Sequence, residues 1–558
     1  MIGTTALATA IAGAAFGITG QASARQAPAQ APAAAAATGS SYVVMFAQGT
    51  DGAAAVSAAK AAGGTVVRVN RKLGYAVVTT SDAAFAGKVS ASKGVQGAAR
   101  DRVLGKAPKD RRDAIERPSG ATATAAQAPA APAPAEPLAN RQWDMRQIGA
   151  TPQGSYAVNK GSKKVLVGII DTGIDGKHPD VAPNFDATRS ANFVVDNPTI
   201  DGPCEFTSCK DPADWDDDGH GTHVASTIGS PVNGLGIAGV APNVTLVNIR
   251  AGQDSGYFFL QPTLQALEYA GDIGVDVVNM SFYTDPWLYN CLANPADSPA
   301  ERTEQRVVRE LTQRAVNYAL NRGVTPIAAM GNEATDLGRP TTDNTSPDFP
   351  AGAAKPRTVD NSCITVPTET RGVIAVSSTG PSMRKAYYSN YGVEQTEVAA
   401  PGGDAYDSPD LSLDARNLVL AAYPERLARL SGDVDEAGNP TTPFVVKNCK
   451  DTVCGYYQYL QGTSMAAPHA AGVAALLVSR YGHRVGADGW TAPPNRITRL
   501  LYRSSMPHAC PQPRLFHYER FTAAGVRTAD HLCEGGVNFN GFYGHGIVNA
   551  YQAVAGRN

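Results

Sequence analysis

The chain has 558 residues, which is long enough for more than one globular unit. Its 48 basic and 50 acidic residues give a net charge of −2, which argues against a partner chosen by bulk electrostatics, such as nucleic acid. Eight cysteines form an even set without the paired CxxC spacing of zinc ribbons, so they favour disulfides formed in an oxidising compartment.

The N-terminus predicts export. Residues 1–24 are apolar and rich in small residues, and they end in Ala-Ser-Ala before Arg25, which is the form of a signal-peptide cleavage site. The stretch lacks a basic start, so an Ala-rich disordered tail is the alternative. No later stretch reaches the roughly 18 uninterrupted apolar residues of a membrane span, and we expect a secreted product with no membrane partner.

A small α+β unit is expected next. Residues 25–40 are rich in Ala, Pro and Gln and are predicted to be disordered. Residues 41–105 then give the order β-α-β-β-α-β of the ferredoxin-like motif, with strands and helices at Ser41–Phe46, Asp51–Ala62, Thr65–Thr80 (two strands), Asp82–Ser92 and Val95–Leu104.

Residues 106–137 are predicted to be a linker, because this stretch is too poor in bulky apolar residues to pack. Beyond it, short β-branched runs alternate with helical stretches, which indicates a mainly parallel sheet covered on both faces. Residues 138–558 are therefore expected to form one α/β domain, with strands at Val165–Ile170, Val244–Ile249, Val275–Met280, Val324–Ala328 and Val373–Val376 and helices including Pro262–Ala270 and Glu304–Ala319.

Three segments of this domain carry groups suited to acyl transfer. Asp171 follows the first apolar strand in GIIDTGID, His220 stands in DDDGHGTHVAS at the start of a helix, and Ser464 opens the long apolar helix of QGTSMAAPHAAG. A serine hydroxyl becomes a nucleophile when an imidazole removes its proton and a carboxylate orients that imidazole. Each residue alone has a structural explanation, such as a turn or helix cap.

Together, the blocks DTGID, GHGTHVA and GTSMAAPHAAG, in the order Asp, His, Ser, resemble the signature blocks of the subtilisin-like serine proteases. The resemblance runs from about Trp143 to the segment GHGIVNAYQA. It implies a subtilisin-like three-layer domain and a monomeric serine endopeptidase, which cleaves proteins or peptides through an acyl-enzyme without an organic cofactor. Asp171, His220 and Ser464 would be its catalytic triad.

The resemblance extends to residues that would contact the substrate. The block IAAMGNE implies that the Asn332 side chain completes the oxyanion hole. One wall of the specificity pocket and the edge that docks an extended peptide are matched by Ser281, Phe282, Tyr283, Ser255 and Gly256. Tyr283 departs from the pattern, because a small glycine is usual there.

A structural calcium site is also implied. The HPDV sequence and the loop SPVNGLGI match a site common in the family, with ligands expected from Asp180, Pro231, Asn233, Leu235 and Ile237. The alternative for this loop is a solvated turn without metal.

The unit at 41–105 resembles the propeptide that this family uses as a folding aid and built-in inhibitor. Its own propeptide is thus an expected partner, and the first self-cleavage is expected near Val103 to Ala107. Two rival functions remain: a catalytically silent binding protein on the same scaffold, and a metal-dependent hydrolase using Asp171, His220 and His223. Labelling of Ser464 by serine-directed phosphonates would exclude the metal-dependent rival.

Three long segments are extra relative to a minimal member of the family: Ala191–Asp214, Tyr283–Ala300 and Asp404–Cys454. We expect them to be surface insertions stapled by disulfides and to govern specificity. Cys204 with Cys209 and Cys449 with Cys454 are close enough to close small loops, which leaves the other four cysteines for longer bridges.

Overall fold

The computed structural model describes residues 40–102, 113–118, 136–485 and 489–556. The predicted signal peptide, nearly all of the predicted disordered stretch 25–40 and the expected cleavage region Val103–Ala107 lie outside these ranges. Residues Gly39–Asn558 form one unit.

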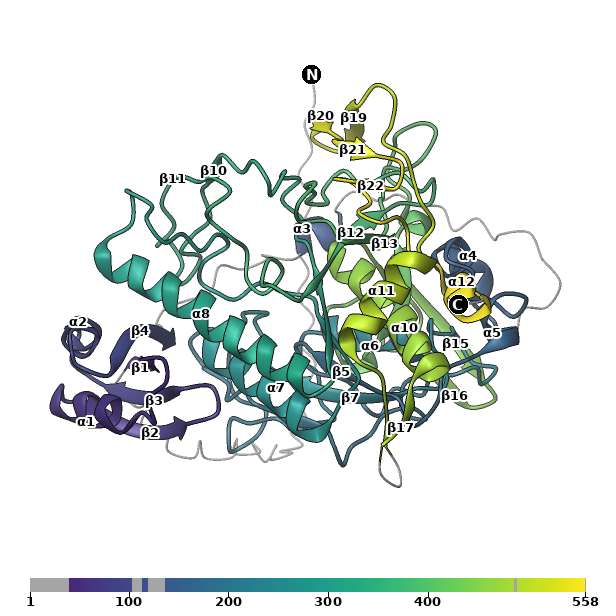
Figure 1. The fold of residues 1–558 in the computed structure, drawn as a ribbon. Helices are drawn as coiled ribbons and strands as arrows, with labels where there is room; N and C mark the ends of the chain where they lie inside the picture. The colour runs from purple at the N-terminus through teal and green to yellow at the C-terminus, as the bar shows by residue number, and fades with distance from the viewer. Residues whose placement is uncertain (1–39, 103–112, 119–135, 486–488, 557–558) are drawn as a thin grey trace, which may run out of the picture. The chain divides into compact units, whose positions relative to one another are not determined.

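The N-terminal part of this unit confirms the predicted β-α-β-β-α-β order (Figure 1). Its four strands pair antiparallel in the order β2-β3-β1-β4. The elements are β1 (Ser40–Phe46), α1 (Ala53–Ala61), β2 (Thr65–Asn70), β3 (Tyr75–Thr80), α2 (Phe85–Ser90) and β4 (Val95–Arg102).

The larger part is built on a seven-stranded sheet of order β13-β12-β9-β8-β5-β7-β6, in which all neighbouring strands run parallel. The predicted strands are all present, at β5 (Leu166–Ile170), β7 (Thr245–Arg250), β8 (Val277–Met280), β9 (Thr325–Ala329) and β12 (Ile374–Thr379). The two edge strands, β6 (Ala191–Asn192) and β13 (Val398–Pro401), were not predicted from the sequence.

Helices cover both faces of this sheet because side chains alternate along each strand. On one face Val167 and Ile169 pack with α6 (His220–Gly229) and α10 (Thr463–Tyr481). On the other face Ile170 packs with the core formed by α7 (Leu260–Ile273) and α8 (Pro299–Asn321). The mainly parallel three-layer α/β fold expected from the sequence is confirmed.

Shorter elements surround this core. A three-stranded antiparallel sheet of order β14-β16-β15 lies in the third predicted insertion and the strand after it. The elements not yet named are α3 (Asp113–Glu116), η1 (Ala139–Arg141), α4 (Trp143–Gln147), α5 (Ser155–Val158), β10 (Thr342–Asp343), β11 (Arg357–Thr358), η2 (Ala415–Asn417), β14 (Val419–Tyr423), α9 (Glu425–Leu430), β15 (Val445–Lys450), β16 (Val453–Leu460), β17 (His483–Val485), β18 (Gly489–Thr491), α11 (Pro494–Ser504), β19 (Leu515–Thr522), β20 (Gly525–Leu532), β21 (Gly535–Gly536), β22 (Phe539–Asn540) and α12 (Ala550–Ala555).

The N-terminal sheet packs against α7 and α8. Met45 and Tyr75 of the sheet belong to the same buried core as Leu264 and Val307 of these helices. The guanidinium of Arg314 donates to the carbonyl of Leu73 at 3.2 Å, so backbone contacts accompany the apolar ones. Because much of one sheet face is buried here, the N-terminal unit has the contact expected of a docked propeptide.

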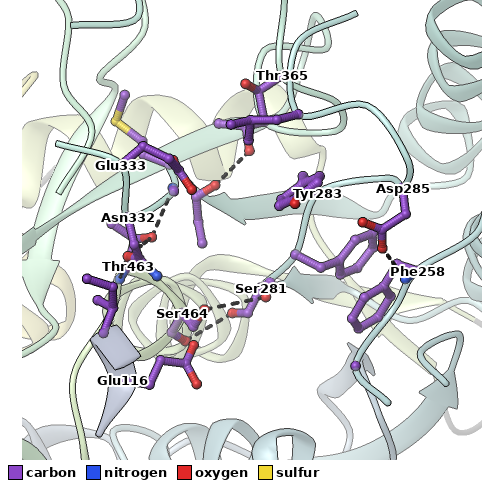
Figure 2. Close-up of a pocket in the computed structure, with 18 of the residues that line it drawn as sticks. Glu116, Phe258, Ser281, Tyr283, Asp285, Asn332, Glu333, Thr365, Thr463 and Ser464 are labelled. Atoms are coloured by element: carbon purple, nitrogen blue, oxygen red, sulfur yellow. Dashed lines mark hydrogen bonds between the residues drawn. The ribbon is translucent and has the colours of Figure 1, made fainter. Parts of the chain in front are cut away.

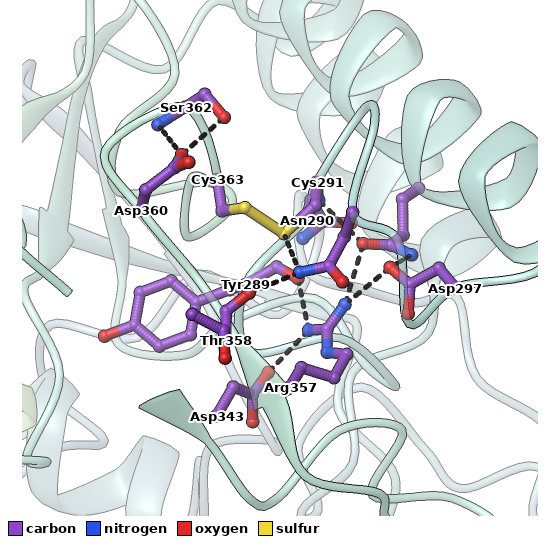
Figure 3. Close-up of a disulfide and its surroundings, with 12 residues drawn as sticks. Tyr289, Asn290, Cys291, Asp297, Asp343, Arg357, Thr358, Asp360, Ser362 and Cys363 are labelled. Carbon is purple, nitrogen blue, oxygen red and sulfur yellow. Dashed lines mark hydrogen bonds and ion pairs between the residues drawn. A yellow bond between two sulfur atoms is a disulfide. The ribbon is translucent and has the colours of Figure 1, made fainter. Parts of the chain in front are cut away.

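All eight cysteines are paired, as Cys204–Cys209, Cys449–Cys454, Cys291–Cys363 and Cys510–Cys533. The two short bridges were predicted. The Cys291–Cys363 bridge fastens the insertion after β8 close to a buried ion-pair network (Figure 3). In that network Arg357 donates to Asp297 at 3.0 Å and to Asp343 at 2.5 Å.

Among the residues that the structure describes, no helix combines the length and the apolar character needed to cross a bilayer.

Candidate active site

Three elements carry the residues of the predicted triad. Asp171 directly follows β5, His220 is the first residue of α6, and Ser464 is the second residue of α10. The close approach of α6 to the strand end requires glycine at 221, since a Cβ there would lie 2.0 Å from the carbonyl oxygen of Gly173. The glycines beside His220 therefore have a steric role in placing it.

The Asp171 carboxylate and the His220 imidazole form a buried pair. Asp171 Oδ1 lies 2.7 Å from His220 Nδ1 and also accepts the Thr172 backbone N–H at 2.8 Å. This arrangement fixes the imidazole so that Nε2 is the nitrogen directed away from the carboxylate. The Ser464 hydroxyl donates to the Ser281 carbonyl at 3.4 Å.

Asn332 is oriented by the residue before Ser464. Its Oδ1 accepts the backbone N–H of Thr463 at 2.9 Å and the Thr463 hydroxyl at 3.0 Å. Because the carbonyl end is engaged in this way, the NH2 group is the end left to the cavity that Asn332 lines with Ser464. This is the orientation that a donor to an oxyanion requires.

A cavity of about 410 Å³ opens beside Ser464. The predicted substrate-contacting residues all line it: Ser255, Gly256, Ser281, Phe282 and Tyr283. Phe258 stacks on Phe282 with ring centroids 4.0 Å apart, which gives one wall an apolar surface. The Tyr283 hydroxyl donates to Asp348 at 2.7 Å.

The same cavity is acidic. Asp218, Asp285 and Glu333 line it, and no Lys, Arg or His is found among the described residues of the lining. Asp285 accepts the backbone N–H of Phe258 at 2.6 Å, which holds its carboxylate at the wall (Figure 2). Neither composition nor net charge indicated this local excess of negative charge.

The structure also places part of the predicted linker in the site. Glu116 lines the cavity (Figure 2) and is 7% exposed. Its Oε1 lies 3.5 Å from His220 Nε2. Gln461, three residues before Ser464, donates its backbone N–H to the Glu116 carbonyl at 3.0 Å and its side-chain NH2 to the Ile115 carbonyl at 2.8 Å. The expectation of an unpacked linker throughout 106–137 is therefore corrected at Ile115–Pro118, and no periodic pattern in the sequence indicated this contact.

Glu116 changes the electrostatics of His220. Burial by itself lowers the pKa of His220, but the charges of Asp171 and Glu116 outweigh it and raise that pKa to about 10. With Glu116 in place, the imidazole is thus held in its protonated form at neutral pH. A protonated imidazole cannot take a proton from Ser464.

His223 points away from the triad. Its Nε2 lies 3.2 Å from the carbonyl oxygens of Val419 and Gln458, and burial lowers the pKa of His223 to about 3. This geometry gives His223 a structural role. The orientation of His223 disfavours the rival metal site at Asp171, His220 and His223. In addition, Asp171 Oδ1 and His220 Nδ1 already bind each other.

The residues predicted to bind calcium lie together but are hydrogen-bonded to one another. Asp180 accepts the Asn233 NH2 and the Ile237 backbone N–H, both at 3.0 Å, and the Lys450 ammonium donates to the Asn233 carbonyl at 2.6 Å. Burial raises the pKa of Asp180 to about 8. In this arrangement donors, rather than converging oxygens, surround the carboxylate, so a bound calcium would require Asn233 and Lys450 to move. The backbone of Pro231 and Leu235 belongs to the same loop.

A second acidic group suits a cation better. The carboxylates of Asp196, Glu205 and Asp211 lie within 4.8 Å of one another in the insertion before His220. Both Asp196 oxygens are buried without a hydrogen-bond partner, and burial together with the charge of Asp211 raises the pKa of Asp196 to about 7. Oxygen ligands at this spacing fit a hard divalent cation. The sequence analysis did not select these residues.

Residues 162–546 match the model of the subtilase family, peptidase S8. The chain belongs to the subtilase family. By homology this subtilase is a serine peptidase, and its fold, with a small α+β unit before the family domain, matches what was expected from the sequence.

Several proteins are similar to this subtilase. Subtilisin DY from Bacillus licheniformis is 29% identical over 317 residues, which are 57% of this chain and 77% of that protein. Thermitase from Thermoactinomyces vulgaris is 27% identical over 344 residues, 62% of this chain and 84% of that protein. A thermophilic serine proteinase from Bacillus sp. (strain AK1) is 29% identical over 335 residues, 59% of this chain but only 57% of that proteinase.

Solved structures share the fold. The epidermin leader peptide processing serine protease from Staphylococcus aureus superposes with a TM-score of 0.60 at 20% identity, covering 93% of this chain and 99% of that one. Fervidolysin from Fervidobacterium pennivorans, a keratinolytic enzyme, gives a TM-score of 0.53 at 21% identity, covering 93% of this chain and 61% of that one.

Proposed function

We propose that this subtilase is a secreted serine endopeptidase made as an inactive proform, with Asp171, His220 and Ser464 as its catalytic triad. The observation that carries the proposal is the buried Asp171–His220 pair at the start of α6. Ser464, at the start of α10, lines one cavity with Asn332. The rival binding protein without activity finds less support, because every group needed for acyl transfer is present.

In the proposed reaction, the Ser464 hydroxyl turns from the Ser281 carbonyl toward His220 and attacks the peptide carbonyl as Nε2 takes its proton. Asp171 stabilises the resulting imidazolium through Nδ1. The Asn332 NH2 and backbone N–H groups at the start of α10 stabilise the oxyanion. His220 then gives its proton to the leaving amine, and water hydrolyses the acyl-enzyme by the same route in reverse.

Two contacts keep the proform inactive in this proposal. The described N-terminal unit (residues 40–102) rests on α7 and α8 as the propeptide, and Glu116 holds His220 protonated. Maturation would remove both by cleavage ahead of the family domain. Eight paired cysteines support an extracellular location, since such bridges persist in oxidising compartments.

We also propose that the enzyme is stabilised by bound calcium, with Asp196, Glu205 and Asp211 as the best-suited ligands. When bound, the ion would neutralise the buried Asp196 carboxylate in the insertion that leads to His220. The Asp180 loop remains a second predicted site.

The experiment that tests the function is mass spectrometry of the expressed chain and of Ser464→Ala, each with and without a fluorophosphonate probe. The expected result is that the wild type loses its N-terminal unit and carries the probe on Ser464, whereas the variant remains a full proform without the probe. A folded wild-type protein that neither matures nor reacts, with calcium present, would overturn the proposal and favour the binding protein.

A further inference from the structure

Arg117, the residue after Glu116, is bound by the protease domain. Its guanidinium makes two parallel hydrogen bonds to the Asp433 carboxylate, from Nη1 to Oδ2 at 2.6 Å and from Nη2 to Oδ1 at 2.5 Å. It also lies over the Phe444 ring, with Cζ 5.4 Å from the ring centroid. Fork-shaped pairing and stacking on an aromatic ring are the two features by which proteins distinguish arginine from lysine.

The acceptor at this position is held in place before any ligand arrives. Asp433 Oδ2 accepts the Ser431 hydroxyl at 3.0 Å and the Tyr423 hydroxyl at 3.3 Å. The Asp433 side chain is 10% exposed and that of Arg117 is 27% exposed, so water competes only partly for the pair. Phe444 is buried in the core formed around Tyr457 and Leu418. The carboxylate and the ring are therefore a rigid receptor for a planar cation.

The location of this receptor links it to the catalytic centre. Gln461 holds the two preceding residues, Ile115 and Glu116, by their carbonyl groups, and Gln461 itself is buried three residues before Ser464. The Gln461 amide is oriented by the backbone N–H of Ala405, which donates to Oε1 at 2.7 Å. A peptide that replaces Ile115 and Glu116 on Gln461 would thus place the side chain of its following residue at Asp433.

We propose that Asp433 and Phe444 form an arginine-binding subsite of the cleft, which Arg117 fills in the proform and an arginine of a peptide substrate fills in the mature enzyme. The inference rests on the proposed peptidase function and deepens it, because it assigns a substrate class to an insertion that a minimal relative lacks. Gln461, which links the subsite to Ser464, is outside the lining of the acidic cavity. That cavity extends from Ser464 toward Phe258 and Asp285 (Figure 2).

The first arm of the test does not depend on activity. In full-length Ser464→Ala, a glutamyl endopeptidase is added and the cut between Glu116 and Arg117 is followed by mass spectrometry. We expect Asp433→Asn to accelerate this cut about tenfold, because the paired charge-assisted hydrogen bonds that hold Arg117 are lost. Asp435→Asn, on the same loop but exposed, is the matched control and should leave the rate unchanged. Arg117→Ala breaks the contact from the other side without altering the protease domain and should accelerate the cut equally.

The second arm uses the matured wild type, Asp433→Asn and Asp435→Asn with peptides that carry one arginine, lysine or alanine at each of four positions after the cleaved bond. We expect one position at which arginine is preferred over alanine by about tenfold in kcat/KM and lysine is intermediate. Asp433→Asn should abolish that preference and Asp435→Asn should retain it.

The outcomes separate the inference from the function on which it rests. Hydrolysis without any arginine preference, or with a preference that survives Asp433→Asn, overturns the substrate subsite. An unchanged Glu116 cut in both Asp433→Asn and Arg117→Ala overturns the bound state of Arg117. Absence of all hydrolysis overturns the proposed function, and the first arm then still decides whether the receptor holds Arg117.

Discussion

The Glu116 carboxylate lies 3.5 Å from His220 Nε2, the nitrogen that must accept the serine proton. A residue of the linker therefore stabilises the one protonation state of the imidazole in which it cannot act as a base. The inhibitory contact is electrostatic as well as steric.

The first prediction concerns the pH dependence of maturation. Self-processing requires neutral His220, so its rate should rise with pH toward the pKa of about 10 that His220 has in the proform. Glu116→Gln removes one of the two charges that raise this pKa, and the rise should move to lower pH. The rate of proform loss between pH 6 and 10 measures this. Glu436→Gln, an exposed acid on the neighbouring insertion, should not shift the profile.

A stability measurement on Ser464→Ala checks the same assignment. Because the pKa of His220 is raised above its usual 6.5, its contribution to stability is complete below that pH and is lost as the pH rises through about 10. The melting temperature of the proform should fall over this range, and less steeply in Glu116→Gln. Equal slopes in the two proteins would contradict the role given to Glu116.

The second prediction concerns Asn332. Asn332→Ala should lower kcat about 10²–10³-fold with little change in KM, because the lost donor serves charge that develops only in the transition state. Thr463→Val removes a hydroxyl that orients the Asn332 amide and accepts the Gly331 backbone N–H, and it should lower kcat less. A higher KM at unchanged kcat would instead mean that Asn332 binds substrate in its ground state.

The third prediction follows from the acidic cavity. Peptides with arginine in the residue before the cleaved bond should be hydrolysed at least about tenfold faster, by kcat/KM, than peptides with glutamate, since carboxylates act strongly at short range in a partly buried site. Glu333→Gln should reduce this ratio, whereas the exposed Glu394→Gln should not. Equal rates for the two peptides in low salt would show that the cavity charge does not govern selection.

The fourth prediction separates the two calcium sites. A chelator should lower the melting temperature of the mature enzyme, and calcium should restore it. In Asp196→Asn this response should be lost, because one of the three carboxylates of the acidic group is gone. In Asp180→Asn the response should persist. The opposite pattern would assign the calcium site to the Asp180 loop.

Much of this protein could be read from its sequence because the relevant interactions are local. Apolar periodicity specifies the strands of a sheet that is buried on both faces, and the short motifs around Asp171, His220 and Ser464 combine a reactive group with the glycines that its turn requires. The two short disulfides follow from chain proximity in the same way.

What only the tertiary structure decided depends on residues far apart in the chain. Glu116 contacts His220, and Arg117 binds Asp433, which lies 316 residues further along the chain. Neither Glu116 nor Arg117 belongs to a periodic pattern or a motif. The edge strands β6 and β13 are too short to leave a pattern of their own, and the acidic cavity collects Asp218, Asp285 and Glu333 from separate loops. Sequence patterns report how a segment buries its own side chains, whereas the charge and the occupant of a cleft are properties of surfaces that exist only once those segments have packed together.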